Sequence, residues 1–266
     1  MLAEQRIYHT LKIAVAMCFI GHGAFGIITK EIWCNYFAVF GIGRETAYTL
    51  MPIVGISDII LGIVMLIYPA RFIPAWLVFW GVITAMLRPL SGEPFGEFVE
   101  RAGNYGAPFV LLLLAGFPLS IRNIFSPMQV PVNTSEQKLK QVTLALRIIV
   151  FLLLAGHGWL NLVEKKSLID QYSSLGLTNP SKVADFVGVA EIIAAISVLI
   201  QPFAPFLLIL FAWKMVSEIL YPHYAIFEWI ERGGSYGCIL ALWFALRAGR
   251  QPRKIPFSPP NLGTSL

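Results

Sequence analysis

The chain has 266 residues, of which 57% are hydrophobic and 13% are charged, and its formal net charge is +5. A soluble domain carries roughly a quarter of charged residues, so this composition excludes an ordinary soluble protein. Apolar stretches near the length that spans a bilayer, about 20 residues, recur along the whole chain. We therefore interpret the chain as a polytopic membrane protein and its positive charge as a signal of topology, with no nucleic acid as a partner.

Eight transmembrane helices are expected, because a backbone in lipid must satisfy its own hydrogen bonds. The last expected span is the weakest, since its purely apolar part is short. In chain order the expected spans are residues 10–29, 46–68, 72–90, 104–121, 143–163, 183–201, 203–221 and 235–249.

The distribution of lysine and arginine predicts that both termini are cytoplasmic, in a bacterial inner membrane. With the N-terminus inside, only Glu4 and Glu136 oppose the basic residues of the inner segments. The basic residues of these segments are Arg6, Lys12, Arg71, Arg122, Lys138, Lys140, Arg147, Arg247, Arg250, Arg253 and Lys254. This asymmetry follows the positive-inside rule.

The chain contains an internal repeat. Two decapeptides are similar, EFVERAGNYG (97–106) and EWIERGGSYG (228–237). The alignment extends to His22 with His157 and to Asp58 with Glu191. We expect a four-helix repeat in 1–122, a cytoplasmic linker in 123–141 and a second four-helix repeat with a basic tail in 142–266. Four spans per repeat is an even number, so the repeats should be parallel and related by a pseudo-twofold axis.

Each copy of the decapeptide predicts a short amphipathic helix at the outer interface, just before the last span of its repeat. Apolar residues such as Phe95 and Phe98 fall on one helical face and charged residues on another. Glu97 with Arg101, and Glu228 with Arg232, are expected to form ion pairs four residues apart.

Ionisable residues inside membrane spans usually face protein or a water-filled cavity. We expect those of this chain to gather in the outer half of the bundle, under the two amphipathic helices as lids, with no metal ion. The candidate catalytic residues are His22, Asp58, His157 and Glu191. The candidate ligand-binding residues are Arg88, Glu97, Glu100, Arg101, Glu218, Glu228, Glu231 and Arg232.

Three motifs, in this order and in duplicate, resemble the DoxX-like family. They are a histidine flanked by small residues in the first helix (GHG, 21–23 and 156–158), an acidic residue in the second helix (GVAEIIAAI, 188–196) and an ERxxNY-type start of the fourth helix (100–105). The family includes the membrane subunit of a thiosulfate:quinone oxidoreductase. The resemblance implies two fused four-helix bundles and a link to membrane redox chemistry, but it transfers no catalytic residue. Asp58 stands where the second copy has Glu191, and Arg88 aligns with Glu218, so the two halves are expected to differ in their tasks.

The polar residues support several hypotheses. In a purely structural one, His22 bonds Asp58, His157 bonds Glu191, and Arg88 pairs with Glu218 or with an interfacial glutamate, while Lys214 neutralises Glu218. In another, histidine and carboxylate manage the protons of a quinone that is reduced with the help of a partner redox subunit. Such a quinone would lie among the aromatic side chains of Trp33, Phe95, Trp159 and Trp229.

Three alternatives remain open from the sequence, as does the question of whether the protein is an enzyme at all. The two aligned histidines would ligate one haem b if the first and fifth spans met. Parallel repeats with intramembrane charges also suit a transporter or a protein that binds a small lipophilic ligand. A scaffold that holds a partner protein is the last alternative.

Overall fold

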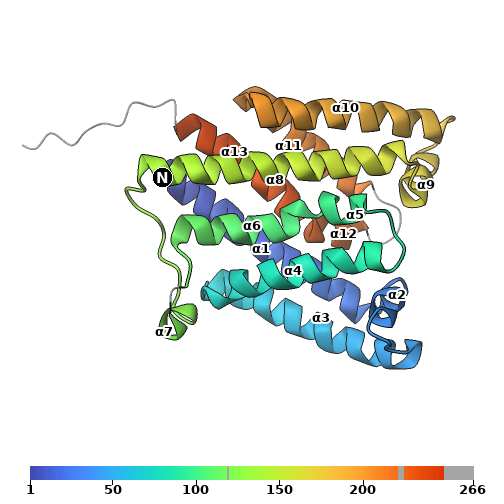
Figure 1. Ribbon diagram of the computed structural model, residues 1–266, viewed down its shortest axis with the longest axis horizontal. Coiled ribbons are helices and arrows are strands. Elements are labelled where there is room, and N and C mark those ends of the chain that lie inside the picture. The colour runs from blue at the N-terminus through green and yellow to red at the C-terminus, as the bar shows by residue number, and fades with distance from the viewer. Residues whose placement is uncertain (119, 221–224, 249–266) are drawn as a thin grey trace, which may run out of the picture.

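The computed structural model describes residues 1–118, 120–220 and 225–248, and this part of the chain is built of helices (Figure 1). Only one isolated β-bridge, between Ala70 and Pro127, accompanies them in these ranges. The helices are α1 (Ala3–Ile27), α2 (Trp33–Ala38), α3 (Arg44–Ile67), α4 (Phe72–Leu90), α5 (Gly96–Glu100), α6 (Ala102–Ala115), α7 (Ile121–Ile124), α8 (Glu136–Leu162), α9 (Lys166–Ser174), α10 (Pro180–Ile200), α11 (Ala204–Ile219), α12 (Ala225–Glu231) and α13 (Gly233–Ala248).

Five of these helices, α1, α3, α4, α8 and α10, are long and apolar enough to cross a membrane. The other three expected spans coincide with α6, α11 and α13, which are shorter. Local signals fix several helix starts: the Ser135 side chain accepts a hydrogen bond from the Lys138 amide at the start of α8, and Asn179 caps α10 ahead of Pro180.

Helices α3 and α10 lie at opposite edges of the molecule (Figure 1). Each of them carries an exposed apolar ridge. The exposed residues recur every three or four positions, so each set forms one face of its helix. Apolar surface of this extent is rare on soluble monomers and is typical of a surface that meets lipid. The ridges consist of Ile53, Ile56, Ile60, Ile63 and Ile67 on α3 and of Phe186, Val189, Ile193, Ile196 and Ile200 on α10.

The centre of the bundle is formed by α6 and α13, which pack against one another, while α1 packs on α3 and α13 and α8 packs on α10, α6 and α13. Glycine permits the crossing of α6 and α13: a Cβ atom on Gly103 would lie 2.6 Å from the backbone nitrogen of Ser235. The two histidine-bearing helices, α1 and α8, do not form one of these principal contacts. The haem b hypothesis depended on a meeting of these two helices.

The two short helices α5 and α12 pack on the opposite half of the chain. Helix α5 lies on α8, where a Cβ atom on Gly156 would be 2.3 Å from the Glu100 nitrogen. Helix α12 lies on α1 in the same way, with Gly21 only 2.2 Å from the Glu231 nitrogen by the same measure. Only glycine allows backbones to approach so closely.

The charged faces of the two short helices point into the protein. Glu97 is fully buried, and Arg232 is 3% exposed, whereas Phe95 is 49% exposed. Both helices therefore turn their charged faces inward. Their acidic and basic side chains can enter the interior because each finds an opposite charge there.

Candidate functional site

Two histidine–carboxylate pairs lie in the bundle. His22 on α1 places Nδ1 2.7 Å from Oδ2 of Asp58 on α3, and His157 on α8 bonds Oε2 of Glu191 on α10. Both bonds were predicted from the sequence, and both are confirmed. Because Nδ1 is engaged in each ring, Nε2 is the nitrogen that remains for another partner.

Glu97 is the centre of an ion-pair network at the end of the bundle where α5 and α12 lie. Its Oε2 atom is 2.5 Å from Nη1 of Arg101 and 3.3 Å from Nη1 of Arg88, and its Oε1 atom meets the ammonium of Lys165. The predicted pair with Arg101 is thus confirmed. Arg88 also contacts Glu93 at 3.3 Å, so it binds interfacial glutamates, as one prediction had it.

The network joins the two halves of the chain through three ion pairs. Lys30 contacts Glu228 at 2.6 Å, Lys165 contacts Glu97, and Arg232 contacts Glu100 at 2.9 Å. The predicted pair between Glu228 and Arg232 is therefore wrong. Because α12 is inserted between the halves, Arg232 reaches across the interface, and Glu228 is neutralised by Lys30 instead.

Lys214 and Glu218 form the predicted pair on α11, with 3.3 Å between Nζ and Oε1, and both side chains are buried. Arg232 also approaches Glu218, at 3.9 Å, so the charge of Glu218 is compensated by Lys214 and Arg232. Arg88 pairs with Glu93 and Glu97, and the alternative pair of Arg88 with Glu218 is not formed. Through Arg232, the charged groups of α11 and α5 therefore belong to one ion-pair network.

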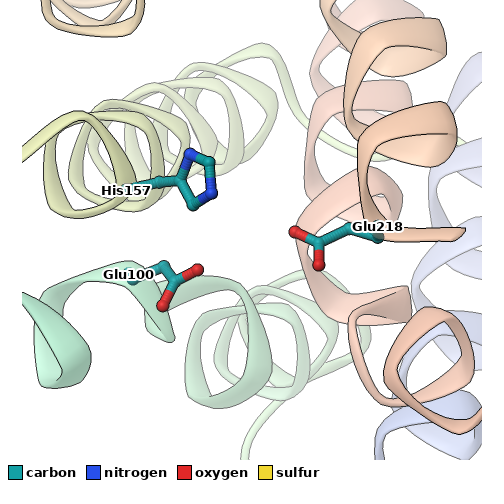
Figure 2. Close-up of side chains that lie close together, drawn as sticks. All are labelled: Glu100, His157 and Glu218. Carbon is teal, nitrogen blue, oxygen red and sulfur yellow. The ribbon is translucent and has the colours of Figure 1, made fainter. Parts of the chain in front are cut away.

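Glu100, His157 and Glu218 converge from three helices, as Figure 2 shows, and one ligand atom from each lies within 4.8 Å of the others. Such a group could hold a metal ion. However, the two carboxylates are already paired with Arg232 and Lys214. A metal ion would have to displace these cations, so the arrangement favours an ion-pair network.

The network controls the acidity of the carboxyl groups on α5. Burial by itself raises the pKa of Glu97, but the charges of Arg101, Lys165 and Arg88 outweigh it and lower the pKa to about 2. Burial likewise opposes ionisation of Glu100, and Arg232 with Arg101 holds its pKa well below the usual range. Both groups are therefore charged in the folded protein at neutral pH.

A lowered pKa makes the stability of the protein depend on acid. The Glu97 carboxylate contributes fully to the free energy of unfolding above the pKa of about 4.3 that it has in the unfolded chain. This contribution is lost as the pH falls toward the folded pKa of about 2. We expect the melting temperature of the detergent-purified protein to fall below pH 5, with up to about 3 kcal/mol lost through this group.

Glu97→Gln should lower the melting temperature at pH 7 and flatten this acid dependence. Glu45→Gln, which changes an exposed carboxylate in the first turn of α3, should leave the whole profile unchanged. Equal profiles for Glu97→Gln and the unmodified protein would contradict the assigned role of Glu97.

A cavity of about 120 Å³ opens beside the first histidine pair. Its walls are largely apolar and include several aromatic rings, and the Trp33 ring lies 4.6 Å from the His22 ring, centroid to centroid. Among the predicted aromatic residues only Trp33 belongs to the lining. Phe95 and Trp159 are exposed, and Trp229 lies against Tyr236. The polar part of the lining consists of His22, Lys30, Asp58, Thr84, Arg88, Arg101, Asn104 and Glu231.

The second histidine pair has a smaller cavity, of about 70 Å³, lined by His157, Tyr172 and Trp213 among others. Helix α11 lines this cavity as α4 lines the larger one, and the two helices differ at equivalent positions. Trp80 and Trp213 are separated by the same number of residues as Asp58 and Glu191. At that same spacing, Gly81 and Ala85 of α4 correspond to Lys214 and Glu218 of α11, so this spacing places Ala85, and not Arg88 as expected above, opposite Glu218. Helix α11 thus carries a buried ion pair where α4 has two small residues.

Sequence reasoning missed several residues of this site. Lys30 and Lys165 were not proposed, although each follows its histidine by the same number of residues and each pairs with a glutamate of the other half. Tyr36 was also missed; its hydroxyl donates to Glu93 at 2.5 Å on the rim of the cavity. The repeat spacing could have revealed the lysines, whereas nothing in the local sequence marks Tyr36.

Comparison with known protein families gives one match, and it covers helices that carry the second histidine–carboxylate pair, His157 with Glu191. The DoxX family model matches residues 142–224, which include α10, α11 and most of α8. These residues are DoxX-like. The DoxX-like segment thus contains His157, Glu191 and the Lys214–Glu218 pair, while the larger cavity lies in the other half. No curated protein and no solved structure matches the chain. The DoxX match and the long apolar helices together identify an integral membrane protein.

Proposed function

We propose that the protein consists of two DoxX-like four-helix units, residues 1–122 and 142–266, joined by the segment 123–141. In this proposal α6, α11 and α13 also cross the bilayer, which gives eight spans, and both termini lie in the cytoplasm of a bacterial cell. The reciprocal contacts support it. Lys30 of the first unit pairs with Glu228 of the second, and Lys165 of the second pairs with Glu97 of the first.

We further propose that the cavity beside His22 binds a lipophilic ring of the quinone type, as part of a membrane oxidoreductase. The observation that carries this proposal is the combination of apolar walls that include several aromatic rings with the partly buried His22–Asp58 pair in one cavity. Ligand sites are commonly apolar hollows with a few converging polar groups. The nearby charges compensate one another, as Arg88 does with Glu93 and Glu97, so the site suits an uncharged ligand.

In this function His22 is the group that handles protons. Reduction of a quinone to a quinol takes up two electrons and two protons. We assign the electrons to a partner redox subunit, one proton to the His22 imidazolium and the second to water. Asp58, bonded to Nδ1, holds the ring in place. His157 and Glu191 then have a mainly structural role, because the cavity beside them is smaller and a buried ion pair lies on the neighbouring helix α11.

The proposal is tested by binding of menadione, a short quinone, to the detergent-purified protein. His22→Ala should weaken binding by about tenfold, because it removes both a hydrogen-bonding group and the ring that packs on Trp33. His9→Ala, on the same helix but outside the cavity lining, is the matched control and should bind normally. Absence of menadione binding by the unmodified protein, or equal binding by His22→Ala, would refute the proposed site. Flux of quinone across liposomes without an electron donor would indicate a transporter instead.

A further inference from the structure

The two equivalent tryptophans of α4 and α11 differ in their hydrogen bonding. Nε1 of Trp213 donates to Oε1 of Glu191 at 3.0 Å. Nε1 of Trp80 is buried and has no hydrogen-bond partner among the described residues. Buried indole N–H groups usually find an acceptor. The unpartnered donor of Trp80 therefore calls for a physical reason.

That reason lies in the length of the neighbouring carboxylate. Glu191 uses Oε2 to bind His157 and Oε1 to bind Trp213, so one side chain serves both partners. Asp58 is shorter by one methylene group, and it binds His22 through Oδ2. The aspartate keeps the contact with its histidine but makes no hydrogen bond with the tryptophan.

Trp80 belongs to the lining of the large cavity and lies beside its proton-handling histidine. The ring centroids of Trp80 and His22 are 6.4 Å apart, with the rings nearly perpendicular. Trp76 stacks on Trp80 at 5.7 Å, which restricts the position of the indole. A ligand in this cavity therefore meets the Trp80 indole and the His22 imidazole on adjoining parts of the wall.

We propose that Trp80 is a ligand-binding residue whose Nε1–H donates a hydrogen bond to an oxygen acceptor of the cavity ligand, and that Asp58 leaves this donor free for it. The inference rests on the proposed function and makes its substrate class more specific. The ligand is an uncharged ring that carries a carbonyl oxygen, and a plain hydrocarbon of the same shape lacks the group that Trp80 recognises. The chain then has one such site, because the equivalent donor of the second unit is taken by Glu191.

The test compares two probes of nearly equal shape, menadione and 2-methylnaphthalene, which lacks the two carbonyl oxygens. Trp80→Phe keeps an aromatic ring but removes the donor. It should weaken menadione binding by about 3- to 10-fold and leave 2-methylnaphthalene binding within about 2-fold. Trp213→Phe, the matched control in the second unit, should change neither affinity.

A second variant tests the same idea without removing an aromatic ring. Asp58→Glu keeps the charge and the bond to His22 but lengthens the side chain to that of Glu191, so it should capture the Trp80 donor. Menadione binding should fall by a similar factor, and Asp58→Glu combined with Trp80→Phe should be no weaker than Trp80→Phe alone.

The outcomes separate this inference from the function on which it rests. Normal menadione binding by Trp80→Phe would overturn the role of Trp80 while leaving the cavity as a quinone site. An equal loss for both probes would also overturn it, because the indole would then contribute packing and not a hydrogen bond. Failure of the unmodified protein to bind menadione would refute the proposed function itself.

Discussion

Arg232→Ala is expected to lower the free energy of unfolding by about 3 to 5 kcal/mol, a loss large enough to prevent normal accumulation of the folded protein. The Arg232 side chain is 3% exposed and lies 2.9 Å from Glu100 and 3.9 Å from Glu218. Its removal would leave two buried carboxylates with one cation each, Arg101 for Glu100 and Lys214 for Glu218. Thermal unfolding in detergent and the yield of monodisperse protein measure the effect.

An exposed ion pair provides the matched control. Arg44 contacts Glu31 at 2.5 Å, but 61% and 72% of these side chains are exposed, so Arg44→Ala should cost less than about 1 kcal/mol. Combining Arg232→Met with Glu100→Gln should recover part of the loss, since both members of the pair become uncharged. If Arg232→Ala melts at the temperature of the unmodified protein, the inter-half network does not hold the fold together.

The sequence predicted the positions of the main helices well, because apolar length and helix-start signals are local properties. The expected span 72–90 is the observed helix α4, Phe72–Leu90. The bonds of His22 to Asp58 and of His157 to Glu191 could also be predicted, since each joins polar residues in successive apolar segments that need a partner. A polar residue in an apolar helix has few polar side chains within reach, so its hydrogen-bond partner can be predicted.

The sequence could not predict which charges pair across the two halves. Spacing favoured Glu228 with Arg232, but the structure pairs Glu228 with Lys30. This choice depends on how closely α12 approaches α1 at Gly21, a distance that only the packed structure defines.

The two cavities lie beside helices that differ at equivalent positions, and the structure is needed to recognise what this sequence difference does. Gly81 and Ala85 are unremarkable small residues in an apolar helix until the equivalent positions are seen to hold Lys214 and Glu218 as a buried pair. Gly81 of α4 belongs to the lining of the larger cavity beside His22, whereas Glu218 of α11 belongs to the lining of the smaller cavity beside His157. The small side chains of α4 therefore accompany the larger cavity, which is the proposed ligand site.

The combination of Gly81→Lys and Ala85→Glu should abolish this site without unfolding the protein. Gly81 belongs to the lining of the cavity, so a lysine there would occupy the space in which the ring is proposed to bind, and a glutamate four residues later would supply its charge partner, as in α11. Loss of the apolar contacts of one ring corresponds to about 3 kcal/mol, so menadione affinity should fall by about 100-fold. The melting temperature should stay close to that of the unmodified protein, because each new charge is introduced with its partner.

Gly81→Ala is the control for this double substitution. A Cβ atom at this position would lie 3.3 Å from Cβ of Tyr105, a tight contact that a small shift relieves, and the cavity would stay open. Menadione affinity should therefore change by less than about 2-fold, since one methyl group removes little of the cavity. If the folded double variant still bound menadione normally, the quinone would have to bind elsewhere, and the open region beside His22 would be only a packing difference between the two halves. Loss of binding in the double variant alone would show that the absence of the α11 ion pair is what gives the first half its ligand site.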